Sequence, residues 1–352
     1  MDYQYPLLKR IFDHFYKSDK DLSDIYLVCC QHLLEPQAKM FELFIDLGFS
    51  PQKIIILGKA YSANVEIAKE ITKKGLRVLT PKFSGISFDE EHQKNCKEIL
   101  GLVPAEANVV ILDDGAELIM TFAHDRRNVL FAVEQTSSGF RKLENNKTTF
   151  PVINVARSVT KLTQESPLVA RLCFERIIKY LLEKGLEKPE VLVVGLGPIG
   201  ESVREVFKQN DFIVHGFDTK LGHNDLLSFV IDKKPDVIIG ATGVTIFSRD
   251  DIEKMNRSKP LYLISVSSSD REFPVVSFRK NAEIYDDVQY KNIVFVNNGF
   301  PITFKGNRNE LLPLEIEKTV ALLSGSILYG VEKGVVGGGV VDVPKSLEQL
   351  IN

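Results

Sequence analysis

A short apolar strand, a glycine-rich turn and a helix in direct succession constrain this chain more than any other feature of its sequence. The apolar run covers 191–194, the turn reads GLGPIG at 195–200, and the helix pattern continues with Val203, Val206 and Phe207 on one face. Glycines in this pattern permit a tight turn and a close approach of the backbone to a pyrophosphate at the helix N-terminus. The pattern therefore predicts a Rossmann unit that binds a dinucleotide. The predicted contacts are Gly195, Gly197, Pro198, Ile199 and Gly200.

An acidic residue after the next strand indicates which dinucleotide this is. Asp218 follows the apolar run 212–217 and lies about 20 residues beyond the glycines, where a carboxylate can accept hydrogen bonds from the ribose diol. A carboxylate there repels a 2′-phosphate, so we expect NAD rather than NADP, a preference that Lys220 nearby could soften. A flavin nucleotide and a glycine turn without a ligand are the alternatives.

Apolar runs alternate with helix-period segments along the whole chain and predict an α/β fold. Helix patterns such as 36–47 and 63–74 separate short apolar runs, which is typical of parallel strands covered on both faces. A long helix pattern at 166–185 stands between two such series. The predicted strands are 25–28, 53–57, 77–79, 108–112 and 128–132 before that helix, and 191–194, 212–217, 236–239, 261–266 and 293–296 after it.

The two series indicate two domains. A chain of 352 residues, 44% of them hydrophobic, is long enough to build both. We predict an α/β substrate domain with a parallel sheet over 1–165 and a Rossmann NAD-binding domain over 166–304. The last helix pattern, 312–329, indicates that the chain returns, so that 305–352 complete the first domain.

Charge and hydropathy exclude several classes of partner. A formal net charge of -3 provides no basic field for nucleic acid. No apolar run approaches the roughly 18 residues that span a bilayer, so we expect no membrane role and a cytoplasmic location. Cys29, Cys30 and His32 are close in sequence, but adjacent strand residues point to opposite faces, and no metal site is predicted.

Several segments carry a more specific signal. The sequence ILDDGAEL at 111–118 is similar to an LDDGGDL motif, EQTSSG at 134–139 to an EETTTG motif, and INVARSVTK at 153–161 to an INVNDSVTK motif. GATG at 240–243 and VNNG at 296–299 follow two of the later strands. In this order the segments resemble the S-adenosylhomocysteine hydrolase family.

The resemblance implies an activity. That family uses a tightly held NAD to oxidise a ribose 3′-hydroxyl of its substrate, which acidifies the neighbouring C4′ hydrogen and permits elimination of homocysteine. By resemblance, Lys161 is the base at that hydroxyl, Glu165 is the acidic residue shortly after it, and His32 and Asp114 form the acid/base pair on the substrate side. The resemblance also implies cofactor contacts at Thr136, Ser137, Ser138, Thr242 and Asn297, and substrate contacts at Glu134 and Gln135. It further implies a homo-oligomer, for which we expect a dimer.

Each catalytic candidate has a simpler alternative. Lys161 taken alone would be a solvated surface lysine. Asp114 could cap the helix that begins near Gly115, and His32 could be an ordinary turn or cap residue after a strand.

Departures from the motifs shape the functional hypothesis. Gln135 stands where the family has a glutamate, and Ser268 stands where it has a histidine. Loss of a histidine general base costs about two to four orders of magnitude in rate. We therefore expect NAD-dependent oxidation of a ribose hydroxyl in a nucleoside- or sugar-like substrate, followed by altered chemistry. The rival hypotheses are a catalytically silent NAD-binding homologue that acts as a sensor or regulatory partner, and an ordinary dehydrogenase for a small hydroxy acid.

Overall fold

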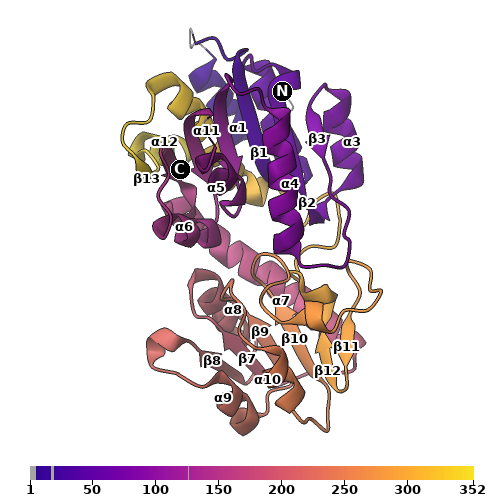
Figure 1. Cartoon of the computed structure of the whole chain (residues 1–352). Coiled ribbons are helices and arrows are strands. Elements are labelled where there is room, and N and C mark those ends of the chain that lie inside the picture. Colours follow the sequence, from indigo (N-terminus) through magenta and orange to yellow (C-terminus); the bar gives the residue numbers. More distant parts are fainter. Residues whose placement is uncertain (1–4, 17–19, 126) are drawn as a thin grey trace. The chain divides into compact units, whose positions relative to one another are not determined.

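The predicted α/β class, a Rossmann-type unit together with a second α/β unit built on a parallel sheet, is confirmed. The computed structural model describes residues 5–16, 20–125 and 127–352 (Figure 1). Among these residues, no helix is both long enough and apolar enough to span a bilayer. Helices and strands alternate along the chain as the hydrophobic pattern predicted.

The chain divides into two compact units. Unit 1 contains the described residues up to Lys82 together with 91–165 and 306–352, and unit 2 contains 83–90 and 166–305. Unlike the division predicted from sequence, a short segment from the first half of the chain belongs to unit 2.

Unit 1 is built on a parallel sheet of seven strands in the order β13-β6-β5-β4-β1-β2-β3. Because every neighbouring pair is parallel, the carboxyl ends of all the strands meet at one edge of the sheet. The strands are β1 (Ile25–Leu33), β2 (Ile54–Ala63), β3 (Arg77–Leu79), β4 (Asn108–Asp113), β5 (Asn128–Glu134), β6 (Pro151–Asn154) and β13 (Gly339–Asp342). Sequence reasoning found the first five and missed β6 and β13.

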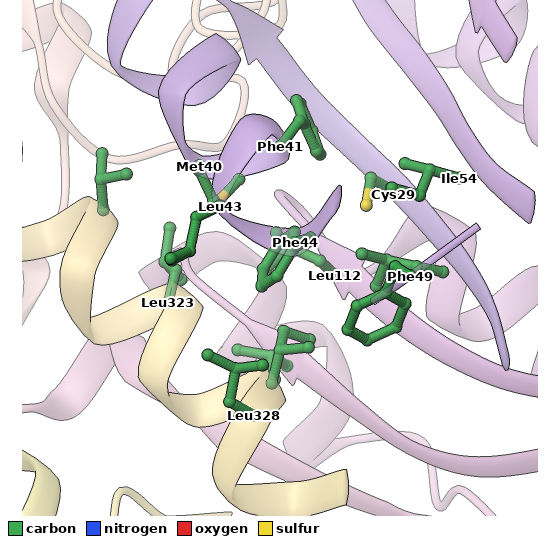
Figure 2. Packing of buried hydrophobic residues seen from close by; sticks show 14 of the residues in the cluster. Cys29, Met40, Phe41, Leu43, Phe44, Phe49, Ile54, Leu112, Leu323 and Leu328 are labelled. Atoms are coloured by element: carbon green, nitrogen blue, oxygen red, sulfur yellow. The ribbon is translucent and has the colours of Figure 1, made fainter. Parts of the chain in front are cut away.

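Helices cover both faces of this sheet and bury its apolar side chains in two clusters. Figure 2 shows Leu323 and Leu328 on α11 near Leu43 and Phe44 on α2, all buried against the strands. Each such side chain stabilises the fold by about 1.5–3 kcal/mol. The helices that contribute to unit 1 are α1 (Pro6–Phe15), α2 (Glu35–Asp46), α3 (Val65–Lys73), α4 (Phe88–Leu102), α5 (Glu117–Ala123), α6 (Ser137–Glu144), α11 (Pro313–Lys333) and α12 (Lys345–Ile351).

Unit 2 contains a sheet of six strands in the order β11-β12-β10-β9-β7-β8, parallel except for the β11–β12 pair. The chain runs from β7 to β8 on one side and then crosses to β9 on the other, so the strand order reverses at β7. Ligands of open α/β sheets bind at such a reversal, outside the carboxyl ends of the strands. The strands are β7 (Val191–Val194), β8 (Val214–Phe217), β9 (Val237–Gly240), β10 (Leu261–Ser265), β11 (Val288–Tyr290) and β12 (Ile293–Phe295). The helices are α7 (Ser166–Glu183), α8 (Pro198–Gln209), α9 (Leu226–Lys233) and α10 (Arg249–Lys254).

Segment 83–90 belongs to unit 2 because a buried arginine holds it there. The Arg279 side chain is 2% exposed and pairs with Asp270 at 2.8 Å. Its guanidinium also donates to the carbonyl oxygen of Ile86 at 2.8 Å and lies 4.8 Å from the centre of the Phe83 ring. These contacts join residues almost 200 positions apart in sequence, so no local pattern could have predicted them.

Candidate functional site

A buried ion pair lies at the carboxyl edge of the unit 1 sheet. The Lys59 ammonium, within β2, donates to the carboxylate of Asp114, which follows β4, and both side chains are 3% exposed. Burial acts to raise the pKa of Asp114, but Lys59 and His32 outweigh it and hold that pKa well below its usual range. Burial acts to lower the pKa of Lys59, but Asp114 outweighs it and raises that pKa. Both groups are therefore charged at neutral pH.

His32 lies between this carboxylate and a serine. Its Nε2 is 3.2 Å from Asp114 Oδ2, and its Nδ1 is 2.5 Å from Ser62 Oγ. Because Asp114 is ionised, it can only accept a hydrogen bond, so Nε2 carries the hydrogen that points to it, while Nδ1 lies within hydrogen-bond distance of the Ser62 hydroxyl. The structure thus brings together two of the residues predicted to be catalytic.

Gln135, the departure from the family motif, binds the same carboxylate. Its Nε2 donates to Asp114 Oδ2 at 2.6 Å, and its Oε1 accepts from Gln31 Nε2 at 2.9 Å. A second carboxylate at this position would repel Asp114, whereas the amide supplies a donor. The substitution therefore fits the charge of its surroundings.

Asp113, and not Asp114, accepts a hydrogen bond from the helix that follows β4. Asp113 Oδ2 accepts the backbone N–H of Ile119 at 2.8 Å, while Asp114 makes the contacts described above. The residue before α5, Ala116, has a left-handed backbone with φ 59° and no side-chain cap. The alternative that Asp114 caps this helix is therefore wrong. Burial raises the pKa of Asp113 to about 6.

Glu134 is a completely buried carboxylate that accepts from two turns. It accepts the backbone N–H groups of Gly115, Ala116 and Thr136 at 3.1, 2.9 and 2.7 Å, and the Thr136 hydroxyl at 2.6 Å. A Cβ on Gly139 would lie 2.3 Å from its carboxyl carbon, so only glycine fits there. Burial and the charge of Asp113 raise the pKa of Glu134 to about 8. This predicted substrate contact is thus occupied by hydrogen bonds within the protein.

Three predicted cofactor contacts lie at the N-terminus of α6 in unit 1. Thr136 is the N-cap, and its Oγ1 accepts the backbone N–H of Gly139 at 3.0 Å. Ser137 and Ser138 form the first turn, with Ser138 Oγ 3.2 Å from Thr136 Oγ1. These three residues directly follow β5, so they lie at the same carboxyl edge of the sheet as the ion pair.

Lys161 and Glu165 form a second ion pair in a π-helical turn (Lys161–Glu165) after β6. Lys161 Nζ donates to Glu165 Oε1 at 2.5 Å, and Glu165 Oε2 accepts from the Thr319 hydroxyl on α11. The two charged side chains are 14% and 16% exposed, so the description of Lys161 as a solvated surface lysine does not fit.

Packing within unit 2 requires a glycine at some positions of the glycine turn but not at all of them. Gly195 has φ +91°, and a Cβ there would lie 2.7 Å from the Thr242 side chain. A Cβ on Gly200 would lie 1.8 Å from the carbonyl oxygen of Gly195, which is backbone and cannot move aside. A Cβ on Gly197 would meet no atom within 4 Å. Pro198 and Ile199 between them begin α8.

Asp218 holds a carboxylate beside this turn. Its Oδ2 accepts the backbone N–H of Leu196 at 2.7 Å, and its Oδ1 accepts that of Lys220 at 2.8 Å. Burial acts to raise the pKa of Asp218, but these hydrogen bonds outweigh it and lower that pKa. The carboxylate is therefore ionised at the end of β8, next to the turn.

Thr242 is bound by a buried glutamate that sequence reasoning did not find. Glu272 Oε1 accepts both the backbone N–H and the hydroxyl of Thr242 at 2.7 Å, and Oε2 accepts the N–H of Gly243 at 2.9 Å. A Cβ on Gly240 would lie 2.2 Å from the Glu272 side chain. Glu272 thus fixes the turn after β9, the strand that pairs with β7, where the strand order reverses.

Asn297 is engaged within its own segment. It is fully buried with φ 56°, and its Nδ2 donates to the carbonyl oxygen of Pro301 at 3.0 Å. Its Oδ1 accepts from Lys305 Nζ at 2.8 Å. The structure therefore gives this predicted cofactor contact a role in shaping the segment after β12.

Sequence reasoning also missed Lys59, Ser62 and Gln31. One signal was available for the lysine, since it directly follows the apolar run 54–57 and Gly58, where a strand leaves the core. A lysine at the carboxyl end of a buried parallel strand is placed to meet acidic residues from neighbouring strands. Among the residues that the structure describes, no group of three or more His, Cys, Asp or Glu side chains could hold a metal ion.

The chain is similar to known proteins at low sequence identity, and in part over only a portion of their length. No family model matches the chain. An uncharacterized protein of Mycobacterium tuberculosis is 29% identical over 340 residues; the match covers 88% of this chain and 65% of that relative, so the chain spans less than two thirds of its length. The adenosylhomocysteinase of Acinetobacter baylyi is 26% identical over 56% of this chain and 44% of its own. An NADPH-dependent glyoxylate/hydroxypyruvate reductase of Sinorhizobium meliloti, solved with NADP and malonate, aligns over 90% of this chain and 96% of its own, at 11% identity and a TM-score of 0.42.

Proposed function

We propose that unit 2 binds NAD at the glycine turn 195–200. The observation that carries this proposal is the contrast among the glycines, because packing requires Gly195 and Gly200 but leaves the position of Gly197 open. A glycine that the protein's own packing does not require leaves space over the N-terminus of α8. Backbone N–H groups there can bind a pyrophosphate.

The ionised Asp218 favours NAD over NADP. Its carboxylate would accept hydrogen bonds from a ribose diol and repel a 2′-phosphate. We expect Asp218→Asn to shift the ratio of NAD to NADP affinity towards NADP by about tenfold, since one charge at a surface site is worth about 1–2 kcal/mol. Calorimetric titration with both nucleotides measures this ratio. Asp225→Asn, which changes an exposed acid at the N-cap of α9, is the control. An unchanged ratio in the Asp218 variant would contradict the assignment.

We further propose that the chain is an enzyme that transiently oxidises a hydroxyl of a nucleoside- or sugar-like substrate. When bound, NAD supplies a hydride acceptor. The Lys161 ammonium, which donates to Glu165, must first lose a proton; the neutral Nζ then accepts the hydroxyl proton, and Glu165, which binds both Nζ and the Thr319 hydroxyl, holds the amine in place. The partial burial of this pair supports a role other than solubility.

The contacts of the other two candidates support different roles for them. Asp114 is locked as a carboxylate between Lys59 and His32, so it orients its partners and does not donate a proton. Histidine exchanges protons near neutral pH, and we assign to His32 the proton transfer at the second reacting position. The resemblance implied that Asp114 and His32 act together as an acid/base pair. We assign them different roles because Asp114 forms an ion pair with Lys59.

The partial similarity to the Acinetobacter baylyi adenosylhomocysteinase supports a nucleoside-like substrate. Gln135 and Ser268 differ from that family's motifs, so we do not propose ordinary hydrolysis of S-adenosylhomocysteine. Gln135 cannot accept a proton at neutral pH, but its amide can hydrogen-bond a ribose hydroxyl. The oxidation half of the reaction is therefore the part that we propose to be retained.

Absorbance of the NAD-loaded protein tests this proposal. After addition of adenosine or S-adenosylhomocysteine, we expect the reduced nicotinamide band to appear. Lys161→Met should abolish the band while NAD still binds, because that residue lies in unit 1 and the glycine turn in unit 2. Lys97→Met, an exposed lysine on α4, should behave like the wild type.

The same absorbance measurement distinguishes the proposed enzyme from the rival hypothesis, a catalytically silent protein that binds NAD. A protein that binds NAD but shows no band and transforms no nucleoside would be a silent binder, and the enzymatic proposal would fail. A protein that does not bind NAD would remove the first proposal as well.

A further inference from the structure

A cavity of about 410 Å³ lies in unit 1, apart from every residue assigned above. Its walls come from α6, the loop after that helix, the end of β6, and the edge strand β13. Small-molecule sites have volumes of about 300–1,000 Å³, so the cavity can hold a small metabolite. None of the residues proposed to bind NAD or to transfer protons lines it.

Arg157 supplies the charge at this cavity. Its guanidinium carbon lies 4.8 Å from the centre of the Phe140 ring, and both residues line the cavity. Among the described residues, the structure records no hydrogen bond or ion pair from this guanidinium. Stacking on a ring orients an arginine while its N–H groups at the edge stay available for a planar anion. A carboxylate or a phosphate accepts two such hydrogen bonds side by side.

Asn154 supplies an unused acceptor. It ends β6, lines the cavity and is 3% exposed. Its Oδ1 is buried and has no hydrogen-bond partner within the described part of the chain. Leaving such a group unsatisfied costs about 1–3 kcal/mol, and because this oxygen is covered from solvent, a molecule in the cavity does not reach it.

The remaining walls limit the charge of the occupant. Lys147 adds a second cation, whereas Glu144 and Asp342 add two acids. The two cations and the two acids cancel, so the lining has no net positive charge to attract a polyanion such as a nucleoside triphosphate, and a single anionic group would be held by direct hydrogen bonds from Arg157. Leu143 and Val340 contribute apolar surface for the rest of the molecule.

We propose that this cavity binds a small metabolite that carries one anionic group, with its carboxylate or phosphate on Arg157 and an apolar part against Leu143 and Val340. The site belongs to unit 1 alone and does not depend on NAD. The failure of either proposal is therefore distinguishable from the failure of the other.

Calorimetric titration of the full chain tests the site with three probes of one shape. Phenylacetate and phenyl phosphate carry the two candidate anions, and neutral phenylacetamide carries neither. We expect at least one anion to bind more tightly than the amide, and the preferred anion distinguishes a carboxylate from a phosphate ligand. Arg157→Gln should weaken that binding by about tenfold or more, because charge-assisted hydrogen bonds are lost. Arg157→Lys should recover only part of it, because lysine lacks the planar fork.

Arg141→Gln is the matched control, because that arginine lies on α6, which forms one wall of the cavity, but does not itself line the cavity. Its affinity for the anion should equal that of the wild type. Circular dichroism verifies that the variants fold. The proposal is overturned if neither anion binds better than the amide, or if Arg157→Gln binds as tightly as the wild type.

Discussion

The carboxyl edges of the two sheets use the same device around different chemistry. In unit 1, Glu134 accepts backbone N–H groups and the hydroxyl of Thr136, and in unit 2, Glu272 does the same with Thr242. Each glutamate is completely buried, and each has a glycine beside it on which a Cβ would collide with the glutamate side chain. Both edges are thus shaped by a carboxylate that binds turns.

The difference lies in what surrounds each carboxylate. Next to Glu134 stand charged side chains, above all the buried pair Lys59 and Asp114 with His32. Next to Glu272 stand the glycine turn 195–200 and its backbone N–H groups. An edge of side chains can hold and move protons, whereas an edge of bare backbone can approach a phosphate closely. The same supporting contact therefore serves two kinds of site.

Removing one partner of the buried ion pair should give the largest effect. Lys59→Met leaves Asp114 as an uncompensated buried charge, and we expect the free energy of unfolding to fall by about 3–5 kcal/mol. Urea denaturation measures this change. Lys53→Met removes a pair with Asp24, whose side chain is 83% exposed, and should cost less than about 1 kcal/mol. Equal losses in the two variants would mean that Lys59 does not stabilise Asp114 as described.

Two alanine substitutions in the glycine turn should separate packing from binding. Gly200→Ala forces a Cβ against the carbonyl oxygen of Gly195 and should cost about 1–3 kcal/mol of stability as well as NAD affinity. Gly197→Ala meets no atom and should change stability by less than about 0.5 kcal/mol, yet weaken NAD binding. Thermal unfolding and NAD titration of both variants provide the measurements. If Gly197→Ala binds NAD as well as the wild type, no ligand approaches that position.

The pH dependence of stability should reveal the proton on Glu134. Its folded pKa of about 8 exceeds the ordinary glutamate value of 4.5, so unfolding releases a proton at pH values between the two. The stability present below about pH 4.5 is therefore lost as pH rises towards about 8, by at most about 1.4 kcal/mol per pH unit for one proton. Glu134→Gln cannot titrate and should flatten this slope. The pKa of Glu272 is raised in the same direction, so Glu272→Gln should flatten the slope as well. Urea unfolding across this range gives both slopes, and a wild-type stability that rises with pH would contradict the assignment.

Removing the two threonine hydroxyls should give the smallest effects. Thr242→Val loses hydrogen bonds at Glu272 and should cost about 1 kcal/mol. Thr136→Val loses the bond to Glu134 and also the N-cap of α6, so it should cost about 1–2 kcal/mol. Urea denaturation of both variants tests the order. A larger loss for Thr242→Val would show that the two turns are not held alike.

Local patterns revealed the parts of the fold that neighbours in sequence determine. Strand β7 has the predicted bounds because an apolar run ends directly at a glycine. Strand β13 was missed because it has only four residues and follows a glycine-rich stretch, so it shows little hydrophobic pattern. Its pairing with β6 also joins distant parts of the chain. Long-range pairing of this kind has no local periodicity.

The residues of the candidate site also fall into two groups, those that the local sequence predicts and those that depend on distant parts of the chain. The glycine turn and Asp218 follow from spacing alone. Lys59 could not be placed, because a lysine is exposed unless it is paired, and its partner Asp114 lies 55 residues later. Sequence reasoning assigned Asp114 by resemblance and did not consider Asp113, the residue whose carboxylate accepts from the helix.

The pairing of β13 with β6 also has a consequence for synthesis. Every residue of unit 2 leaves the ribosome before β13, although domains usually fold in the order in which they emerge. Until β13 arrives, β6 is an open strand edge that can pair with other chains. The nascent protein therefore finishes its second unit before its first, and the interval before β13 appears is when a chaperone would protect it most.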